Sequence, residues 1–137
     1  MGTKKILIVD DELDMRIFLS TLLETGGYTP ILTKNGKEGL QKAREMQPDL
    51  IILDVMMPGA GGVLMYKELK TDSRLQAIPV IMLSAVSEKS FSHYLKMLKV
   101  KIEDTIPQPD AYLEKPLDHE HLLELAGKIL SPGDRAD

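Results

Sequence analysis

The feature of this sequence that most constrains its fold is a repeated alternation of short, mostly apolar runs with amphipathic segments. The apolar runs are rich in Val, Ile and Leu and are short, so they indicate strands that are buried on both faces. Strands of this kind belong to parallel sheets, in which the helices of the crossover connections cover both faces. The predicted strands are residues 4–9, 28–33, 49–53, 78–83 and 111–114.

An amphipathic segment follows each predicted strand. The first has apolar residues at helical spacing from Met15 to Leu23, and two glycines end it. Further helices are predicted at residues 36–46, 63–71, 88–100 and 119–130. Five strand–helix units with right-handed crossovers predict a three-layer α/β domain, a flavodoxin-like (βα)5 fold with a five-stranded parallel sheet in the order 2-1-3-4-5. We expect one domain over residues 1–131, with residues 132–137 as a tail or linker.

The composition excludes several classes of function. A chain of 137 residues, 43% hydrophobic and 28% charged, is typical of one globular domain. The absence of cysteine excludes disulfides and thiolate metal sites, and a net charge of −4 gives no electrostatic footprint for direct nucleic acid binding. No apolar stretch approaches the roughly 20 residues that cross a bilayer. We therefore expect a cytoplasmic domain that does not insert into membranes.

The residues that follow the predicted strands are the candidates for chemistry, because open parallel sheets bind ligands beyond the carboxyl ends of their strands. They are Asp10, Asp11 and Glu12 after the first strand, Asp54 after the third, Ser84 after the fourth and Lys115 after the fifth. Taken singly, the aspartates could be helix N-caps or loop acids, and the lysine could be a solvated surface residue. Together, carboxylates that converge on one edge repel one another, and one lysine cannot balance them. Such a cluster calls for a hard divalent cation, Mg²⁺ or Mn²⁺.

Four segments at these strand ends resemble the signature of the response regulator receiver domain. They are IVDDE at 8–12, LDVMMPG at 53–59, Ser84-Ala85 and Lys115-Pro116, and the resemblance runs in order from about residue 4 to residue 130. No single segment is decisive, but four in order at the expected strand ends are specific.

The resemblance implies a phosphoacceptor and a metal site. Asp54 resembles the residue whose carboxylate takes the phosphoryl group. Asp11 and Asp54 would bind Mg²⁺ through their carboxylates and Met56 through its backbone carbonyl, while Asp10 would act through water.

The resemblance also implies a switch. Lys115 would pair with the phosphoryl oxygens, and Ser84 would donate its hydroxyl to the phosphoryl group. Tyr112 matches the aromatic residue whose side-chain rotamer follows that movement, although an ordinary half-buried strand tyrosine is an alternative. Phosphorylation would change the face formed by the fourth helix, the fifth strand and the fifth helix.

The function implied is that of a signalling switch in a two-component system or phosphorelay, which assists its own phosphorylation and dephosphorylation without being an enzyme in the ordinary sense. Its partners would be a sensor histidine kinase or a histidine phosphotransfer domain, and downstream a protein target or a fused output domain, with a homodimer as an alternative. Rival interpretations are a receiver-like docking module that is not phosphorylated and an Asp-nucleophile phosphatase of the haloacid dehalogenase type. In phosphatases of that type the nucleophile lies in an Asp-x-Asp motif after the first strand, whereas this chain has Asp10-Asp11-Glu12-Leu13 there.

Two features are particular to this chain. Met56 and Val86, two residues beyond Asp54 and Ser84, are apolar and cannot orient an attacking water, so we expect slow self-dephosphorylation. Alternatively, Met56 only contacts neighbouring side chains. The second feature is an insertion at about residues 99–109, which makes the spacing from Ser84 to Lys115 longer than is usual in the family and puts any standard dimerisation mode in doubt. It could specify a partner, cap the switch surface or be a tolerated surface loop.

Overall fold

The computed structural model describes residues 3–55, 57, 61–97 and 107–131, except for the side chains of residues 94–97. Its strands are β1 (Lys5–Val9), β2 (Thr29–Thr33), β3 (Leu50–Asp54), β4 (Val80–Ser84) and β5 (Ala111–Glu114). Its helices are α1 (Leu13–Thr25), α2 (Gly36–Met46), α3 (Gly61–Thr71), α4 (Glu88–Met97) and α5 (His119–Leu130). These elements match the predicted ones to within about two residues, except at the end of the fourth helix, where residues 98–106 lie outside the described part.

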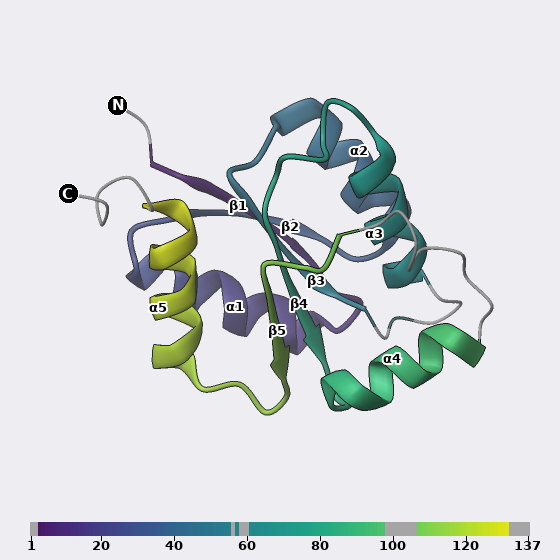
Figure 1. Ribbon diagram of the computed structural model, residues 1–137. Helices are drawn as coiled ribbons and strands as arrows, with labels where there is room; N and C mark the ends of the chain where they lie inside the picture. The colour runs from purple at the N-terminus through teal and green to yellow at the C-terminus, as the bar shows by residue number, and fades with distance from the viewer. Residues whose placement is uncertain (1–2, 56, 58–60, 98–106, 132–137) are drawn as a thin grey trace.

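The strands form one parallel sheet in the order β2-β1-β3-β4-β5, as Figure 1 shows, and the predicted fold is confirmed. The register pairs Val9 with Leu53 and Asp54 with Leu83. Parallel pairing in this register brings the carboxyl ends of β1, β3 and β4 to the same edge of the sheet, which is where a ligand site is expected.

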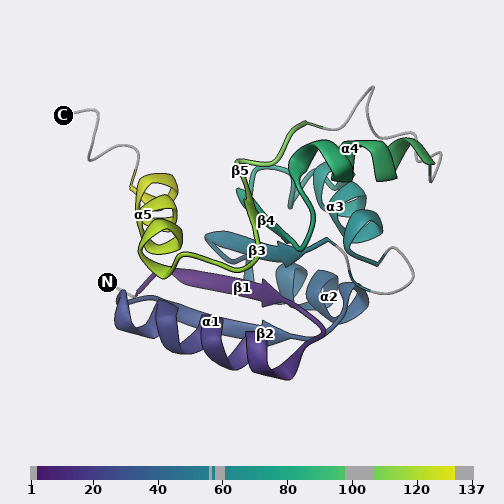
Figure 2. The same ribbon diagram turned by 90° about the horizontal axis from the view of Figure 1, so that it is seen from below.

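Helices cover both faces of the sheet, and each face has its own apolar core. The helices α1 and α5 lie on one face, whereas α2, α3 and α4 lie on the other (Figure 2). Successive strand residues point to opposite faces, so Ile6 and Ile8 pack towards α1 and α5 while Leu7 and Val9 pack towards α2 and α3. Burial on both faces explains why the central strands are continuously apolar and show no polar alternation.

Two aspartates fix the starts of neighbouring strands in the same way. The Asp49 amide donates to the Lys5 carbonyl at 2.8 Å, and its carboxylate accepts from the Lys5 amide at 2.8 Å. The Asp110 amide and carboxylate form the same pair of bonds with Val80, both at 2.9 Å. These paired bonds satisfy backbone groups at the amino ends of β1 and β4, and they fix the chain where β3 and β5 begin.

Side-chain caps fix the starts of two helices, and a glycine follows the end of a third. Asn35 caps α2 by accepting a hydrogen bond from the Glu38 amide at 2.8 Å, and Asp118 caps α5 by accepting from the His121 amide. After α1 the chain turns through Gly27, whose φ of 88° favours glycine. Among the helices described, none is long and apolar enough to span a membrane.

Candidate functional site

The chemistry-bearing residues lie where the strands end. Asp54 and Ser84 are the last residues of β3 and β4, Asp10 follows β1, and Lys115 follows β5. All but the lysine are buried: the exposed fraction is 1% for Asp10, 4% for Asp54 and 0% for Ser84. Charged and polar side chains are rarely buried so deeply unless they are paired, so their partners define the site.

The Lys115 ammonium lies among three carboxylates. Its Nζ atom is 3.5 Å from Asp10 Oδ2, 3.5 Å from Glu12 Oε1 and 3.5 Å from Asp54 Oδ2. The three acids each place one oxygen within 4.8 Å of the others. One positive charge therefore faces three negative charges in a partly buried space.

The surroundings shift the pKa values of Asp10 and Lys115. Burial raises the pKa of Asp10 above its ordinary value, and the charge of Asp54 adds to the rise, against the lowering effect of the hydrogen bond from the Glu12 amide and of Lys115. Burial by itself lowers the pKa of Lys115, but the combined charges of Asp54, Asp10 and Glu12 outweigh it, so that its pKa is raised. Lys115 is thus held as a cation.

The turn between β1 and α1 carries two of the acids and is itself fixed by hydrogen bonds. The Asp10 amide donates to the Thr33 carbonyl at 3.2 Å, and Asp10 Oδ1 accepts from the Glu12 amide at 2.9 Å. The Arg16 guanidinium donates through Nη1 to the Asp10 carbonyl at 2.8 Å. Backbone and side chain of Asp10 are therefore both held.

The acid cluster suits a hard divalent cation. Carboxylate oxygens are the ligands that Mg²⁺ and Mn²⁺ prefer, and the excess of negative charge over the single ammonium would be offset by such an ion. The cluster contains Glu12, the third of three consecutive acids, which was not predicted as a ligand from the sequence. Asp11, a predicted ligand, is exposed and is not in the cluster that the described residues form.

The residues after β4 are linked to β5 through Tyr112. Ser84 Oγ accepts a hydrogen bond from the Val86 amide at 3.1 Å, and the Tyr112 hydroxyl donates to the Val86 carbonyl at 3.0 Å. Burial raises the pKa of Tyr112, and a hydrogen bond with Ser84 partly offsets the rise. The tyrosine ring packs on Phe91 of α4, with 5.6 Å between the ring centroids. Ser84, the turn after it, α4 and β5 are thus in contact.

The remaining predicted features are placed only in part. Met56, predicted as a backbone ligand and as a rim residue, lies outside the described residues. The insertion at 99–109 also lies mostly outside them, but the Tyr66 hydroxyl of α3 donates to the Pro107 carbonyl at 2.5 Å. Val86 is half-buried against the apolar core beside Tyr112.

The Lys115-Pro116 peptide bond, directly after β5, is cis.

The start of α3 packs tightly against the phosphoacceptor candidate. A Cβ atom at Gly62 would lie 2.5 Å from the Asp54 carbonyl oxygen and 2.6 Å from the Val55 Cα atom. Only glycine fits at this distance, so the helix begins directly behind the backbone of Asp54.

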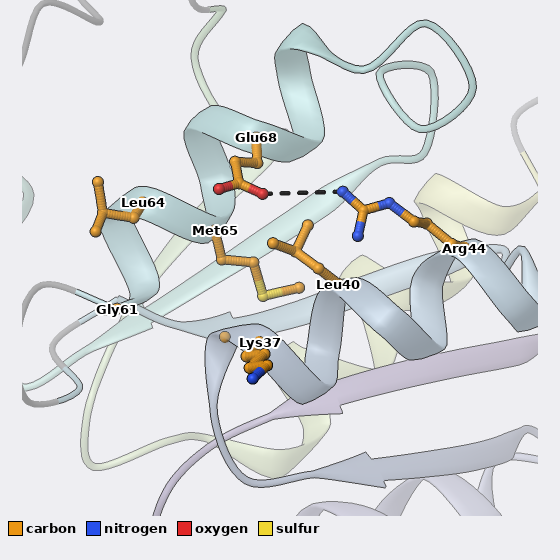
Figure 3. A pocket seen from close by; sticks show the side chains of 8 residues that line it. Lys37, Leu40, Arg44, Gly61, Leu64, Met65 and Glu68 are labelled. Carbon is orange, nitrogen blue, oxygen red and sulfur yellow. Dashed lines mark ion pairs between the residues drawn. The ribbon is translucent and has the colours of Figure 1, made fainter.

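A separate groove of about 280 Å³ lies between α2 and α3 and is bounded by Lys37, Leu40 and Leu64 among others (Figure 3). Arg44 and Glu68 form an ion pair across it at 3.9 Å. None of the strand-end residues lines this groove, and exposed ion pairs of this kind contribute little to stability. The chemistry therefore points to the acid cluster, and not to the groove.

Comparison with known proteins agrees with the geometry. Residues 6–126 match the family model of the response regulator receiver domain. The polar-differentiation response regulator DivK of Brucella anthropi is 38% identical over 124 residues, which cover 88% of this chain and 91% of that protein. The structure of the chemotaxis response regulator CheY4 of Vibrio cholerae superposes with a TM-score of 0.77 at 28% identity, over 94% of this chain and all of that one. The receiver domain of a histidine kinase from Syntrophus aciditrophicus gives a TM-score of 0.79 at 29% identity, over 98% and 96%.

Proposed function

Because the chain belongs to the response regulator receiver domain family of two-component signalling, we propose that it is a phosphoacceptor switch whose acceptor is Asp54. The observation that carries this proposal is the position of the Asp54 carboxylate, 3.5 Å from the Lys115 ammonium and within 4.8 Å of the Asp10 and Glu12 carboxylates. A carboxylate in this position can act as a nucleophile towards phosphorus while a neighbouring cation meets the incoming negative charge.

In the proposed reaction a carboxylate oxygen of Asp54 attacks the phosphorus atom of a phosphohistidine or a small acyl phosphate. The new oxygen–phosphorus bond forms as the bond from phosphorus to the donor's nitrogen or oxygen breaks, and the donor leaves with that electron pair. Lys115 is already charged and close, so it can shift from Asp54 towards the phosphoryl oxygens without travelling far. Positioning and charge neutralisation supply most of the catalysis in such transfers.

Receiver domains bind Mg²⁺ at an acidic pocket, and the donors of this chain fit that ion. We propose that the carboxylates of Asp54 and Asp11 and the Met56 carbonyl hold it, with Asp10 acting through water. The proximity of Glu12 to the cluster makes it a further candidate ligand. When bound, the ion would neutralise charge on the equatorial phosphoryl oxygens.

The signal would leave the site through Ser84 and Tyr112. Ser84 would turn its hydroxyl from the Val86 amide towards a phosphoryl oxygen and take the following turn with it. That turn is bonded to Tyr112, which packs on Phe91, so the movement would reach α4 and β5. The face formed by α4, β5 and α5 would then present a different surface to a partner.

The partners proposed are those that the family requires. A sensor histidine kinase or a histidine phosphotransfer domain would supply the phosphoryl group, and a protein target or a fused output domain would read the switched face. Two of the relatives named above, DivK and CheY4, are themselves described as response regulators, and the third is the receiver domain of a histidine kinase, which supports this placement. A homodimer is a further proposed assembly.

We also propose that the phosphorylated state is long-lived. Val86 is apolar and half-buried, and Met56 is apolar, so neither can orient a water molecule for attack on the phosphoryl group. Replacing Met56 by Asn adds a polar group at the rim and should accelerate phosphate release. Equal rates of release for wild type and Met56→Asn would discard this part of the proposal.

The proposed function is tested by incubating the protein with acetyl phosphate, with Mg²⁺ or with EDTA, and measuring the intact mass. Wild type should gain one phosphoryl group only with Mg²⁺, and Asp54→Ala should gain none. Asp14→Asn, which removes an exposed acid from α1, serves as the control and should behave as wild type does. No adduct on folded wild type would favour the docking module, whereas continuous release of phosphate without a lasting adduct would favour the phosphatase.

A further inference from the structure

Arg16 lies in the first turn of α1 and is half-buried beside the acid cluster. An arginine so close to several carboxylates would be expected to form an ion pair with one of them. Within the described part of the chain it forms none, and its guanidinium donates instead to the uncharged carbonyl of Asp10, at 2.8 Å. The contact is therefore directed at the backbone of the turn that carries the acids.

The position of that carbonyl determines where the acids point. Rotation of the peptide between Asp10 and Asp11 changes ψ of the first and φ of the second, and so redirects the side chains of residues 10–12. The Asp10 amide is fixed to β2 through Thr33, and Asp10 Oδ1 is fixed to the Glu12 amide within the turn. The bond from Arg16 holds the carbonyl itself and connects the turn to α1.

Charge repulsion acts against this conformation. The oxygens of Asp10, Glu12 and Asp54 lie within 4.8 Å of one another, and Glu12 is exposed, so the turn could relieve the repulsion by opening towards solvent. Lys115 opposes such opening from the side of β5, at 3.5 Å from Asp10 and Glu12. Arg16 opposes it from the side of α1. The two cations thus act on the same turn from different elements.

On the basis of the proposed function, we propose that Arg16 is a positioning residue, which holds the turn at residues 10–12 in the conformation that places the Asp10 and Glu12 carboxylates near Asp54 for Mg²⁺ binding. It does not touch the ion. By keeping the binding conformation populated in the metal-free protein it raises the apparent affinity, because the apparent dissociation constant is the intrinsic one divided by the populated fraction.

The test compares Mg²⁺ binding by wild type, Arg16→Met and Arg16→Lys, measured by calorimetric titration at a temperature at which all three are folded. Methionine keeps the apolar stem but has no donor, and we expect a dissociation constant about tenfold higher, as for other groups that hold metal ligands in place. Lysine keeps one cationic donor and should restore part of the affinity. Arg74→Met removes an arginine that is exposed and distant in sequence, and it should bind Mg²⁺ as wild type does, which separates the loss of the contact from the loss of net charge.

A second readout needs no metal. In EDTA the amide of Glu12, which donates to Asp10 Oδ1, should exchange hydrogen faster in Arg16→Met than in wild type, while the amides of the central strand β3 remain equally protected. A contact that only adds to global stability would instead accelerate exchange at all of these amides together. If Arg16→Met does not fold, the same two measurements on Arg16→Lys decide the question.

The outcomes separate this proposal from the proposed function. If wild type and Arg16→Met bind Mg²⁺ equally well, the proposed role of Arg16 is overturned and the phosphoacceptor assignment is left intact. A higher dissociation constant in Arg74→Met, as large as that in Arg16→Met, also overturns it. Folded wild type that binds no Mg²⁺ overturns both.

Discussion

Replacing Asp10 by Asn should stabilise the metal-free protein, although Asp10 is buried and ion-paired. At an effective dielectric constant of about 20, its attraction to Lys115 at 3.5 Å contributes about 5 kcal/mol. Its repulsion from Asp54, at no more than 4.8 Å, costs about 3.5 kcal/mol, and Glu12 adds a smaller, solvent-screened repulsion. The Coulomb terms nearly cancel, and the cost of burying the Asp10 carboxylate remains.

Asparagine removes that cost and keeps an oxygen that can accept the hydrogen bond from the Glu12 amide. Lys115 is not left unpaired, because Asp54 and Glu12 each remain at 3.5 Å. We therefore expect Asp10→Asn to be about 1–2 kcal/mol more stable than wild type in EDTA, a size consistent with a carboxylate whose burial is not fully offset.

Magnesium should remove the stability advantage of Asp10→Asn. An ion that binds only the folded state stabilises it by about 2.7 kcal/mol at one hundred times its dissociation constant. Wild type should gain this stabilisation, whereas Asp10→Asn, with a weaker acid cluster, should gain much less. The two proteins should therefore come closer in stability, or exchange order, as Mg²⁺ is added.

Urea denaturation followed by circular dichroism, in EDTA and in excess Mg²⁺, measures these differences. The control is Asp14→Asn, which removes the same charge from the exposed first turn of α1 and should change stability by no more than about 0.5 kcal/mol. An Asp10→Asn protein that is less stable than wild type in EDTA would refute the reasoning, since the acid cluster would then be a net source of stability.

Three further predictions concern residues outside the acid cluster. Burial raises the pKa of Tyr66 to about 12, so the stability that the neutral hydroxyl contributes is present below pH 10 and is lost as the pH rises from 10 to 12. By pH 11 the free energy of unfolding of wild type, measured by urea denaturation, should fall by about 1 kcal/mol relative to that of Tyr66→Phe. Gly62→Ala should cost at least about 2 kcal/mol in the same assay, because its Cβ would lie 2.5 Å from the Asp54 carbonyl oxygen, and an unchanged midpoint would show that α3 can shift. Asn35→Ala removes the cap on the Glu38 amide and should cost about 1 kcal/mol, with Asn35→Asp as the variant that retains it.

Much of this fold follows from local sequence patterns. Continuous apolar strands such as residues 50–53 can only be buried on both faces, and the right-handed crossover rule then leaves few strand orders. The same reasoning places Asp54 and Lys115 at one edge of the sheet. It does not resolve orientation within a helix where the apolar pattern is broad: Leu64 and Leu69 are both in α3, yet Leu64 is 49% exposed and Leu69 is 1% exposed.

The details of the site depend on contacts that have no local signal. Three consecutive acids follow β1, and which of them lies near Asp54 depends on the backbone torsions of the turn; the sequence named Asp10 and Asp11 for the metal site but not Glu12, which lies near Asp10 and Asp54. The bond from Arg16 to the Asp10 carbonyl could not be predicted for the same reason. The bond from Tyr66 to Pro107 joins residues 41 positions apart, which nothing in either segment indicates.

The most direct test of the central claim is to locate the phosphoryl group. After reaction with acetyl phosphate and Mg²⁺, borohydride reduces an aspartyl phosphate to homoserine, and the position of the homoserine is read by mass spectrometry of peptides. A phosphoacceptor in the geometry described here predicts homoserine at position 54 and aspartate at positions 10, 11 and 49. Homoserine at any of those other positions, with Asp54 unmodified, would contradict it.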